Sequence, residues 1–220
     1  PRRKIAHGHI QQVRQPQHIE HRGPVGLEPR RRIGVDIGVG VVLNAGQGYV
    51  KILGRGVREA VTNAASLPPA YGVRANDLTI TTSGANAGQQ IVLIGQSAGS
   101  TGAGIQVDAG SPGIRLSGLS DPASPPLAST ADVVIGASAD AMAPQALNLG
   151  SFAPNTTGRR NFRPAGVDAS GNITETPATP IRVGNAAGGV PTNFIINPAW
   201  LGGLAVIGSD VQTGLISVEA

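Results

Sequence analysis

Short apolar runs alternate with small, Gly-rich joints between residues 71 and 118. Apolar side chains occupy every second position in Ile105-Gln106-Val107 and in Ile114-Arg115-Leu116, which places them on one face of a strand. Ile, Val and Thr are frequent here, and their β-branched side chains suit a pleated sheet. The pattern predicts short strands over residues 78–80, 91–94, 105–107 and 114–116.

A glycine opens each of three such segments, and another glycine closes it. The openings are Gly34, Gly72 and Gly104, which lie 38 and 32 residues apart. The predicted closures are Gly54, Gly95 and Gly118. Spacings of about 20–50 residues are typical of repeat architectures, in which each copy is too short to bury its own apolar face. We therefore expect an all-β fold, with a parallel β-solenoid favoured and a β-sandwich or barrel as the alternative.

The stretch GVRANDLTITTSGANAGQQIVLIGQSAGSTGAGIQVDAGSPGIRLSG resembles the repeat regions of filamentous-haemagglutinin-like adhesins. The resemblance lies in pattern and composition, and it covers residues 34–120. Members of that family are large exported bacterial proteins whose repeats form right-handed β-helices. The resemblance implies a right-handed parallel β-solenoid, a structural or adhesive role, and a location outside the cell or at its surface.

The amino-acid composition limits which residues can form the core and which chemical groups are available. Only six of the 220 residues are aromatic, so the core is expected to consist of Val, Ile, Leu and Ala in thin layers. The chain has no cysteine, which excludes disulfides, thiolate metal sites and a cysteine nucleophile. No apolar run approaches the ~20 residues that a membrane helix requires, so no membrane span is expected.

Positive charge is concentrated near the N-terminus. Residues 1–60 hold eleven Lys and Arg against four acids, whereas residues 61–220 hold six against nine. Residues 1–33 are interrupted by prolines and predict a basic extended arm. Its basic clusters are candidates for contact with a polyanion, including nucleic acid, or with a partner protein; a solvated extension is the alternative. The clustered residues are Arg2, Arg3, Lys4, Arg30, Arg31 and Arg32.

The arm also holds all four histidines. They are His7, His9, His18 and His21. Their paired spacings are compatible with metal binding, but only Glu20 is available nearby as a further ligand. A solvated basic extension is the favoured interpretation of this arm, so no metal site is expected.

The remaining chain divides by composition. Residues 34–150 are expected to form the β-repeat domain, with a short helix over residues 57–70 as an excursion. Residues 151–180 read as a linker or long loop, in which Arg159, Arg160 and Arg163 flank Phe162 and form a candidate contact site. Residues 181–220 predict further strands and a cap. In that cap, the turn ending at Trp200 closes one end of the core.

No catalytic or cofactor site is expected. Gly95-Gln96-Ser97-Ala98-Gly99 matches the G-x-S-x-G nucleophile elbow, but a strand rather than a helix follows it, and no His lies beyond His21. The acids Asp108, Asp132 and Asp140 could serve a polysaccharide-cleaving enzyme, although the sequence does not place them in one cleft. The glycines of residues 38–48 lack the spacing of a nucleotide-binding loop.

Two non-enzymatic functions follow. The first is an exported structural or adhesive β-solenoid that binds a surface, a glycan or a partner protein. The alternative is a virion or other assembly protein whose basic arm docks on a neighbouring subunit or on nucleic acid. The repeat and the scarcity of aromatic residues favour the first, whereas the uneven charge favours the second.

Overall fold

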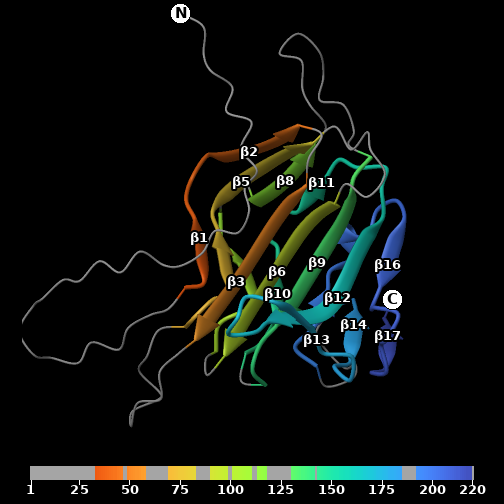
Figure 1. The fold of residues 1–220 in the computed structure, drawn as a ribbon. Helices are drawn as coiled ribbons and strands as arrows, with labels where there is room; N and C mark the ends of the chain where they lie inside the picture. The colour runs from red at the N-terminus through yellow and green to blue at the C-terminus, as the bar shows by residue number, and fades with distance from the viewer. Residues whose placement is uncertain are drawn as a thin grey trace, which may run out of the picture.

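A computed structural model describes residues 33–46, 49–57, 69–82, 90–98, 101–110, 113–117, 130–141, 143–184 and 192–219. Within these ranges the regular structure is almost entirely strand, with one short 3-10 helix at Pro198–Trp200 (Figure 1). The prediction of an all-β chain is therefore confirmed. Residues 58–68 of the expected helix lie outside the described residues.

The first twelve strands fall into three sheets that the chain visits in rotation. Sheet A contains β1 (Val35–Ile37), β4 (Val73–Ala75), β7 (Ile105–Val107) and β10 (Leu147–Asn148). Sheet B contains β2 (Val41–Gly46), β5 (Asp77–Thr82), β8 (Gly113–Ser117) and β11 (Ala153–Pro154). Sheet C contains β3 (Val50–Val57), β6 (Gln90–Ala98), β9 (Asp132–Ser138) and β12 (Arg160–Val167).

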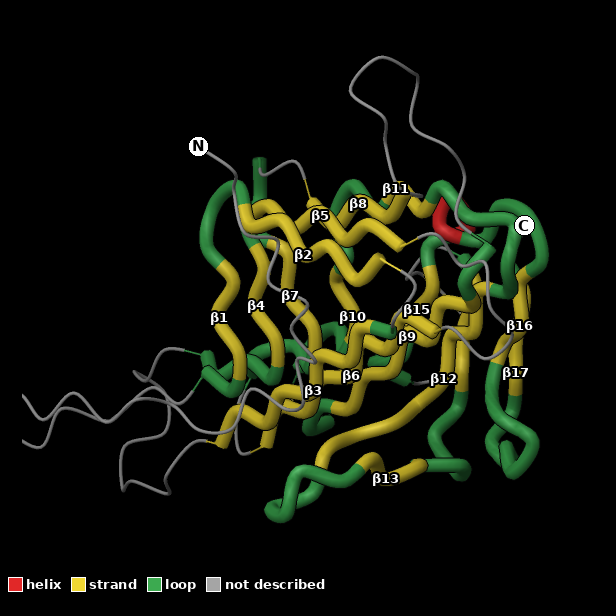
Figure 2. The backbone as a smooth tube through the Cα atoms, turned by 45° about the horizontal axis from the view of Figure 1, so that its top comes forward, coloured by secondary structure: helices red, strands yellow, loops and turns green. Residues whose placement is uncertain are grey.

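Each set of three consecutive strands, here called a triplet, therefore contributes one strand to every sheet (Figure 2). Neighbouring triplets pair in parallel, with Val35 opposite Val73, Val73 opposite Ile105, and Leu147 opposite Ile105. Residues 27 to 42 positions apart in the sequence thus lie side by side. This arrangement accounts for the repeat that the sequence shows.

The inward faces of the three sheets form one apolar core. Val73, Leu78 and Ile91 come from sheets A, B and C of the same triplet, and each is at most 1% exposed. Most of the core is aliphatic, as the composition predicts. Aromatic side chains join it in the C-terminal part, where Phe152 and Phe162 meet edge to face with ring centroids 6.2 Å apart.

The repeated glycines lie where the backbone of sheet C contacts the backbone at the start of sheet A. A Cβ at Gly54 would overlap the carbonyl of Gly72, and a Cβ at Gly95 would overlap the carbonyl of Gly104. Gly72 in turn has no space for a Cβ against the backbone of Gln96. Glycine is required here because two backbones approach more closely than any side chain allows.

The prediction that the third repeated segment ends at Gly118 is wrong. The register places Gly95 opposite Ala137 of β9, so the third triplet closes there, after β8 has been added to sheet B. Gly118 lies outside the described residues. The sequence pattern ended this copy one strand too early because β8 also shows alternating apolar residues.

The prediction of a linker or long loop over residues 151–180 is also wrong. This segment contains β11, β12 and β13 (Ile173–Glu175). The first half of β12 pairs with β9 in sheet C, and its second half forms an antiparallel hairpin with β13.

The hairpin covers the outer face of sheet C. Val167 packs with Val92 and Val134 in a second, smaller core, and the Val167 amide donates a hydrogen bond of 2.9 Å to Gln96 Oε1. This cover explains why Ile91–Ile94 is apolar without alternation, since β6 is buried on both faces.

The C-terminal strands do not continue the rotation in sequence order. They are β14 (Ile181–Val183), β15 (Ile195–Ile196), β16 (Ala205–Ile207) and β17 (Ile216–Val218). β15 lies beside the start of β10, where the Ala146 amide donates to the Asn193 carbonyl, and β14 pairs on its other side. β17 then adds to β14, while β16 adds to β12 in sheet C.

Trp200 lies where this end meets the core. It ends the 3-10 helix Pro198–Trp200, is 6% exposed, and donates a hydrogen bond of 3.2 Å from Nε1 to the Gly150 carbonyl. Asn197 caps the helix by accepting a hydrogen bond from the Ala199 amide. Trp200 thus packs between the last described strands and the fourth triplet.

Gly95→Ala should lower the free energy of unfolding by about 3 kcal/mol, because the added methyl group is opposed by backbone that has no room to move. Urea unfolding followed by circular dichroism measures this. Gly38→Ala is the matched control, since a Cβ there meets no atom within 4 Å. Equal stability of the two variants would contradict the role given to the glycine contact.

Trp200→Ala should lower the free energy of unfolding by about 3–5 kcal/mol, because it empties a large buried volume. Trp200→Phe keeps an aromatic ring and loses the indole hydrogen bond, so it should lower the free energy of unfolding by less than Trp200→Ala does. Thermal melts of both variants test this. A melting curve for Trp200→Ala that matches the unsubstituted protein would show that Trp200 does not hold this end of the core.

Candidate binding site

A row of polar side chains runs across the outer face of sheet A. Asp36, Arg74, Gln106 and Asn148 occupy equivalent positions in successive triplets, because each faces the next in the parallel register. The inward neighbours Val73 and Ile105 are fully buried, so strand alternation turns this row outward. Stacking thus places four polar groups in line from segments far apart in the sequence.

A shallow groove of about 230 Å³ lies along this row. It spans the second to fourth triplets, and none of its lining residues is charged. The lining consists of Tyr71, Thr101, Gly102, Ala103, Gln106, Pro144, Gln145 and Asn148. Typical small-molecule sites enclose about 300–1,000 Å³, so the groove is smaller than a typical small-molecule site.

The amides in the groove are held in place. Asn148 Nδ2 donates a hydrogen bond of 3.4 Å to Gln106 Oε1, and Gln106 Nε2 donates one of 2.6 Å to the Val107 carbonyl. Asn148 Oδ1 accepts from the Gly150 amide at 3.4 Å. These bonds fix which amide atoms face the groove.

An ion pair lies beside the groove. Arg74 donates to both carboxylate oxygens of Asp108, from Nε at 3.0 Å and from a terminal nitrogen at 2.9 Å. The hydrogen bond to Asp108 raises the pKa of the Arg74 guanidinium above its ordinary value, although burial acts in the opposite direction. This pairing balances the charge at the border of the groove.

This arrangement can bind neutral, hydroxyl-rich molecules. Each side-chain amide both donates and accepts hydrogen bonds, which matches hydroxyl groups that do the same. Tyr71 adds an apolar ring with a polar tip. The described residues that line the groove include no carboxylate or imidazole.

The structure describes only three of the predicted contact residues. Arg2, Arg3, Lys4, Arg30, Arg31 and Arg32 lie outside the described residues. The remaining three are separated by the structure. Arg159 is exposed, Arg160 packs over Gly202 and Gly203, and Arg163 lies 3.3 Å from Glu175.

Phe162, expected to join these arginines, is fully buried in the core. Burial lowers the pKa of Arg160 below its ordinary value. A surface that combines the three arginines with an aromatic ring is therefore not formed.

The hydrolase motif does not form a nucleophile elbow. Ser97 lies within β6, is 2% exposed, and donates a hydrogen bond of 2.8 Å to the Ala70 carbonyl. Its hydroxyl bridges β6 to the chain that enters β4.

The three candidate acids do not share a cleft. Asp132 and Asp140 flank opposite ends of β9, roughly 25 Å apart along an extended chain, and Asp108 pairs with Arg74. Within the described ranges, no three His, Asp or Glu side chains come together as metal ligands. The four histidines of the arm lie outside those ranges.

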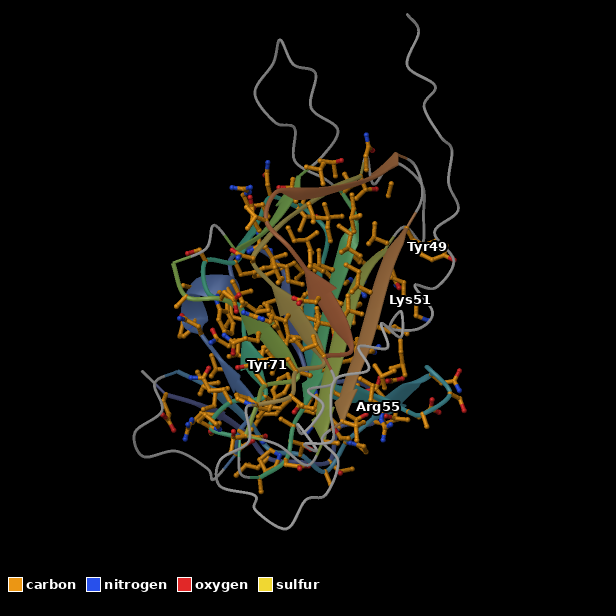
Figure 3. The ribbon with its side chains drawn as sticks, turned by 90° about the vertical axis from the view of Figure 1, so that its left-hand side faces the viewer. Tyr49, Lys51, Arg55 and Tyr71 are labelled. Carbon is orange, nitrogen blue, oxygen red and sulfur yellow. The ribbon has the colours of Figure 1, made fainter. Side chains whose placement is uncertain are left out.

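A basic row along β3 was not identified from the sequence. Tyr49, Lys51 and Arg55 are exposed, and they follow the outer side of this edge strand, away from Tyr71 (Figure 3). Their even spacing, two and four residues apart, is the available signal, because it places them on one side of a strand. The polar row of sheet A had a comparable signal: Asp36, Arg74 and Gln106 each stand two residues after an opening glycine.

Comparisons with known proteins leave the chain without a family. No family model, no curated protein and no solved structure matches it. Across the part of the chain that the structure describes, no helix has the length and apolar character needed to cross a bilayer.

Proposed function

We propose that this chain is a structural and adhesive protein, built as a right-handed parallel β-solenoid, that binds a neutral glycan in the groove of sheet A. The observation that carries the proposal is the in-register row of Arg74, Gln106 and Asn148 beside an uncharged groove. The adhesin-like pattern of the sequence supports an exported location.

The rotation of strands supports the solenoid. Consecutive strands of a sandwich or an up-and-down barrel pair mainly with antiparallel neighbours, whereas β1, β2 and β3 enter three different sheets, each paired in parallel with the next triplet. Parallel crossover connections are right-handed in nearly all proteins, which favours the proposed hand.

The uncharged lining supports a neutral ligand over a polyanion. Lys51 and Arg55 lie on sheet C, whereas the groove lies on sheet A. Because the sheet repeats at ~4.8 Å between strands, the amides of Gln106 and Asn148 present a regular array to successive hydroxyl groups of a chain-like ligand.

The test is calorimetric titration of the full chain with a panel of neutral hexose oligosaccharides. We expect at least one to bind, and Gln106→Ala with Asn148→Ala to weaken its binding about tenfold or more, since each lost hydrogen bond is worth about 1 kcal/mol. Thr174→Ala, on an exposed position of β13, is the matched control and should bind as the unsubstituted protein does.

The salt dependence of the binding affinity distinguishes a neutral glycan from a polyanion. A neutral glycan should bind with the same affinity at low and high ionic strength, because no counterions are released. Unchanged affinity in the double-alanine variant would show that the glycan does not bind in the groove. Failure of every neutral oligosaccharide to bind the folded chain would overturn the proposed ligand.

A further inference from the structure

The exposed large hydrophobic side chains are confined to the two ends of the strand stack. Nine such residues occur among the described ones, three near the first triplet and six after residue 203. They are Val39, Val42, Tyr49, Leu204, Val206, Val211, Leu215, Ile216 and Val218. Scattered exposed apolar residues need no explanation, but a distribution restricted to two ends does.

The two ends face away from each other and carry unpaired strand edges. Among the described strands, β1, β2 and β3 each pair only with the following triplet, and β16 and β17 each pair with one neighbour. In Figure 1 the first triplet lies at one side of the molecule and β16 and β17 lie at the other. Open edges are templates for pairing with another chain.

The two ends differ in charge. The described residues 201–219 carry Asp210 and Glu219 and no basic residue. The described residues of the first triplet carry Lys51 and Arg55 against one acid, Asp36. One end therefore presents two acids beside its apolar residues, with Arg160 lying against Gly202 and Gly203. The other end presents Lys51 and Arg55 beside its apolar residues, so Asp210 and Glu219 can pair with these two groups in a head-to-tail contact between two copies.

We infer that the C-terminal end of one copy binds the N-terminal end of a second copy. The contact buries Leu215 and Val218 of one molecule against Val39 and Val42 of the next, and it brings Asp210 and Glu219 toward Lys51 and Arg55. Because the two surfaces differ and lie at opposite ends, the contact is heterologous and leaves one free end of each kind. Association therefore continues into a linear series of oligomers.

This inference does not depend on the glycan groove, which lies on the outer face of sheet A in the second to fourth triplets. A chain that fails to associate could still bind the glycan, and the reverse also holds. The two proposals therefore fail separately.

The experiment uses the full chain with either end blocked. The N-end variant is Val39→Asp with Val42→Asp, and the C-end variant is Leu215→Asp with Val218→Asp. All four side chains are exposed, so folding should be retained, which circular dichroism verifies. Light scattering coupled to size-exclusion chromatography then measures mass as a function of protein concentration.

The unsubstituted protein should form a concentration-dependent series of oligomers, and each variant alone should be a monomer. An equimolar mixture of the variants should form a 1:1 complex and nothing larger, because one variant keeps the C-terminal end and the other keeps the N-terminal end. Thr174→Asp, on β13, is the control and should associate as the unsubstituted protein does.

Three outcomes would overturn the inference. The unsubstituted chain could stay monomeric up to about millimolar concentration, the range of weak association. Either variant alone could retain the oligomers, which would place the contact elsewhere, as in an assembly held by the basic arm. The mixture could also fail to form the 1:1 complex.

Discussion

The contact between two backbones at the junction of sheets C and A is the constraint on which the rest of the structure depends. Gly54 meets the carbonyl of Gly72, and Gly95 meets that of Gly104, so the strands of a triplet close around a narrow core. A side chain at any of these positions would hold the sheets apart. The narrow cross-section also explains why aliphatic residues suffice for most of the core.

Parallel stacking converts sequence repetition into surface pattern. Residues that follow an opening glycine by two positions become neighbours on the outer face of sheet A, which is how Arg74 and Gln106 come to lie side by side. The same stacking confines exposed apolar groups to the places where it stops, since every inner strand is covered by its neighbours. The proposed glycan groove and the proposed end contacts are thus two consequences of one architecture.

The local sequence pattern was enough to predict most strands, but it was not enough to predict which strands pair with each other. β7 was predicted with the correct bounds because apolar residues alternate cleanly in it. β12 was missed because Pro164 interrupts it and its two halves are buried against different surfaces. The arginines at the start of β12 are close in sequence, yet Arg160 packs over Gly202 and Gly203 whereas Arg163 pairs with Glu175. The groove could not be predicted, since it depends on a register that is fixed only when triplets stack.

The most direct test of this account measures whether residues one triplet apart are neighbours. The chain has no cysteine, so the double variant Thr79→Cys with Arg115→Cys introduces a single pair. These residues face each other across β5 and β8, and adjacent strands lie ~4.8 Å apart, within the range that a disulfide can bridge. Mild oxidation should cross-link this pair within one molecule, and a control pair at residues 79 and 174 should remain reduced. Failure of the 79–115 pair to cross-link in the folded protein would contradict the stacking of triplets.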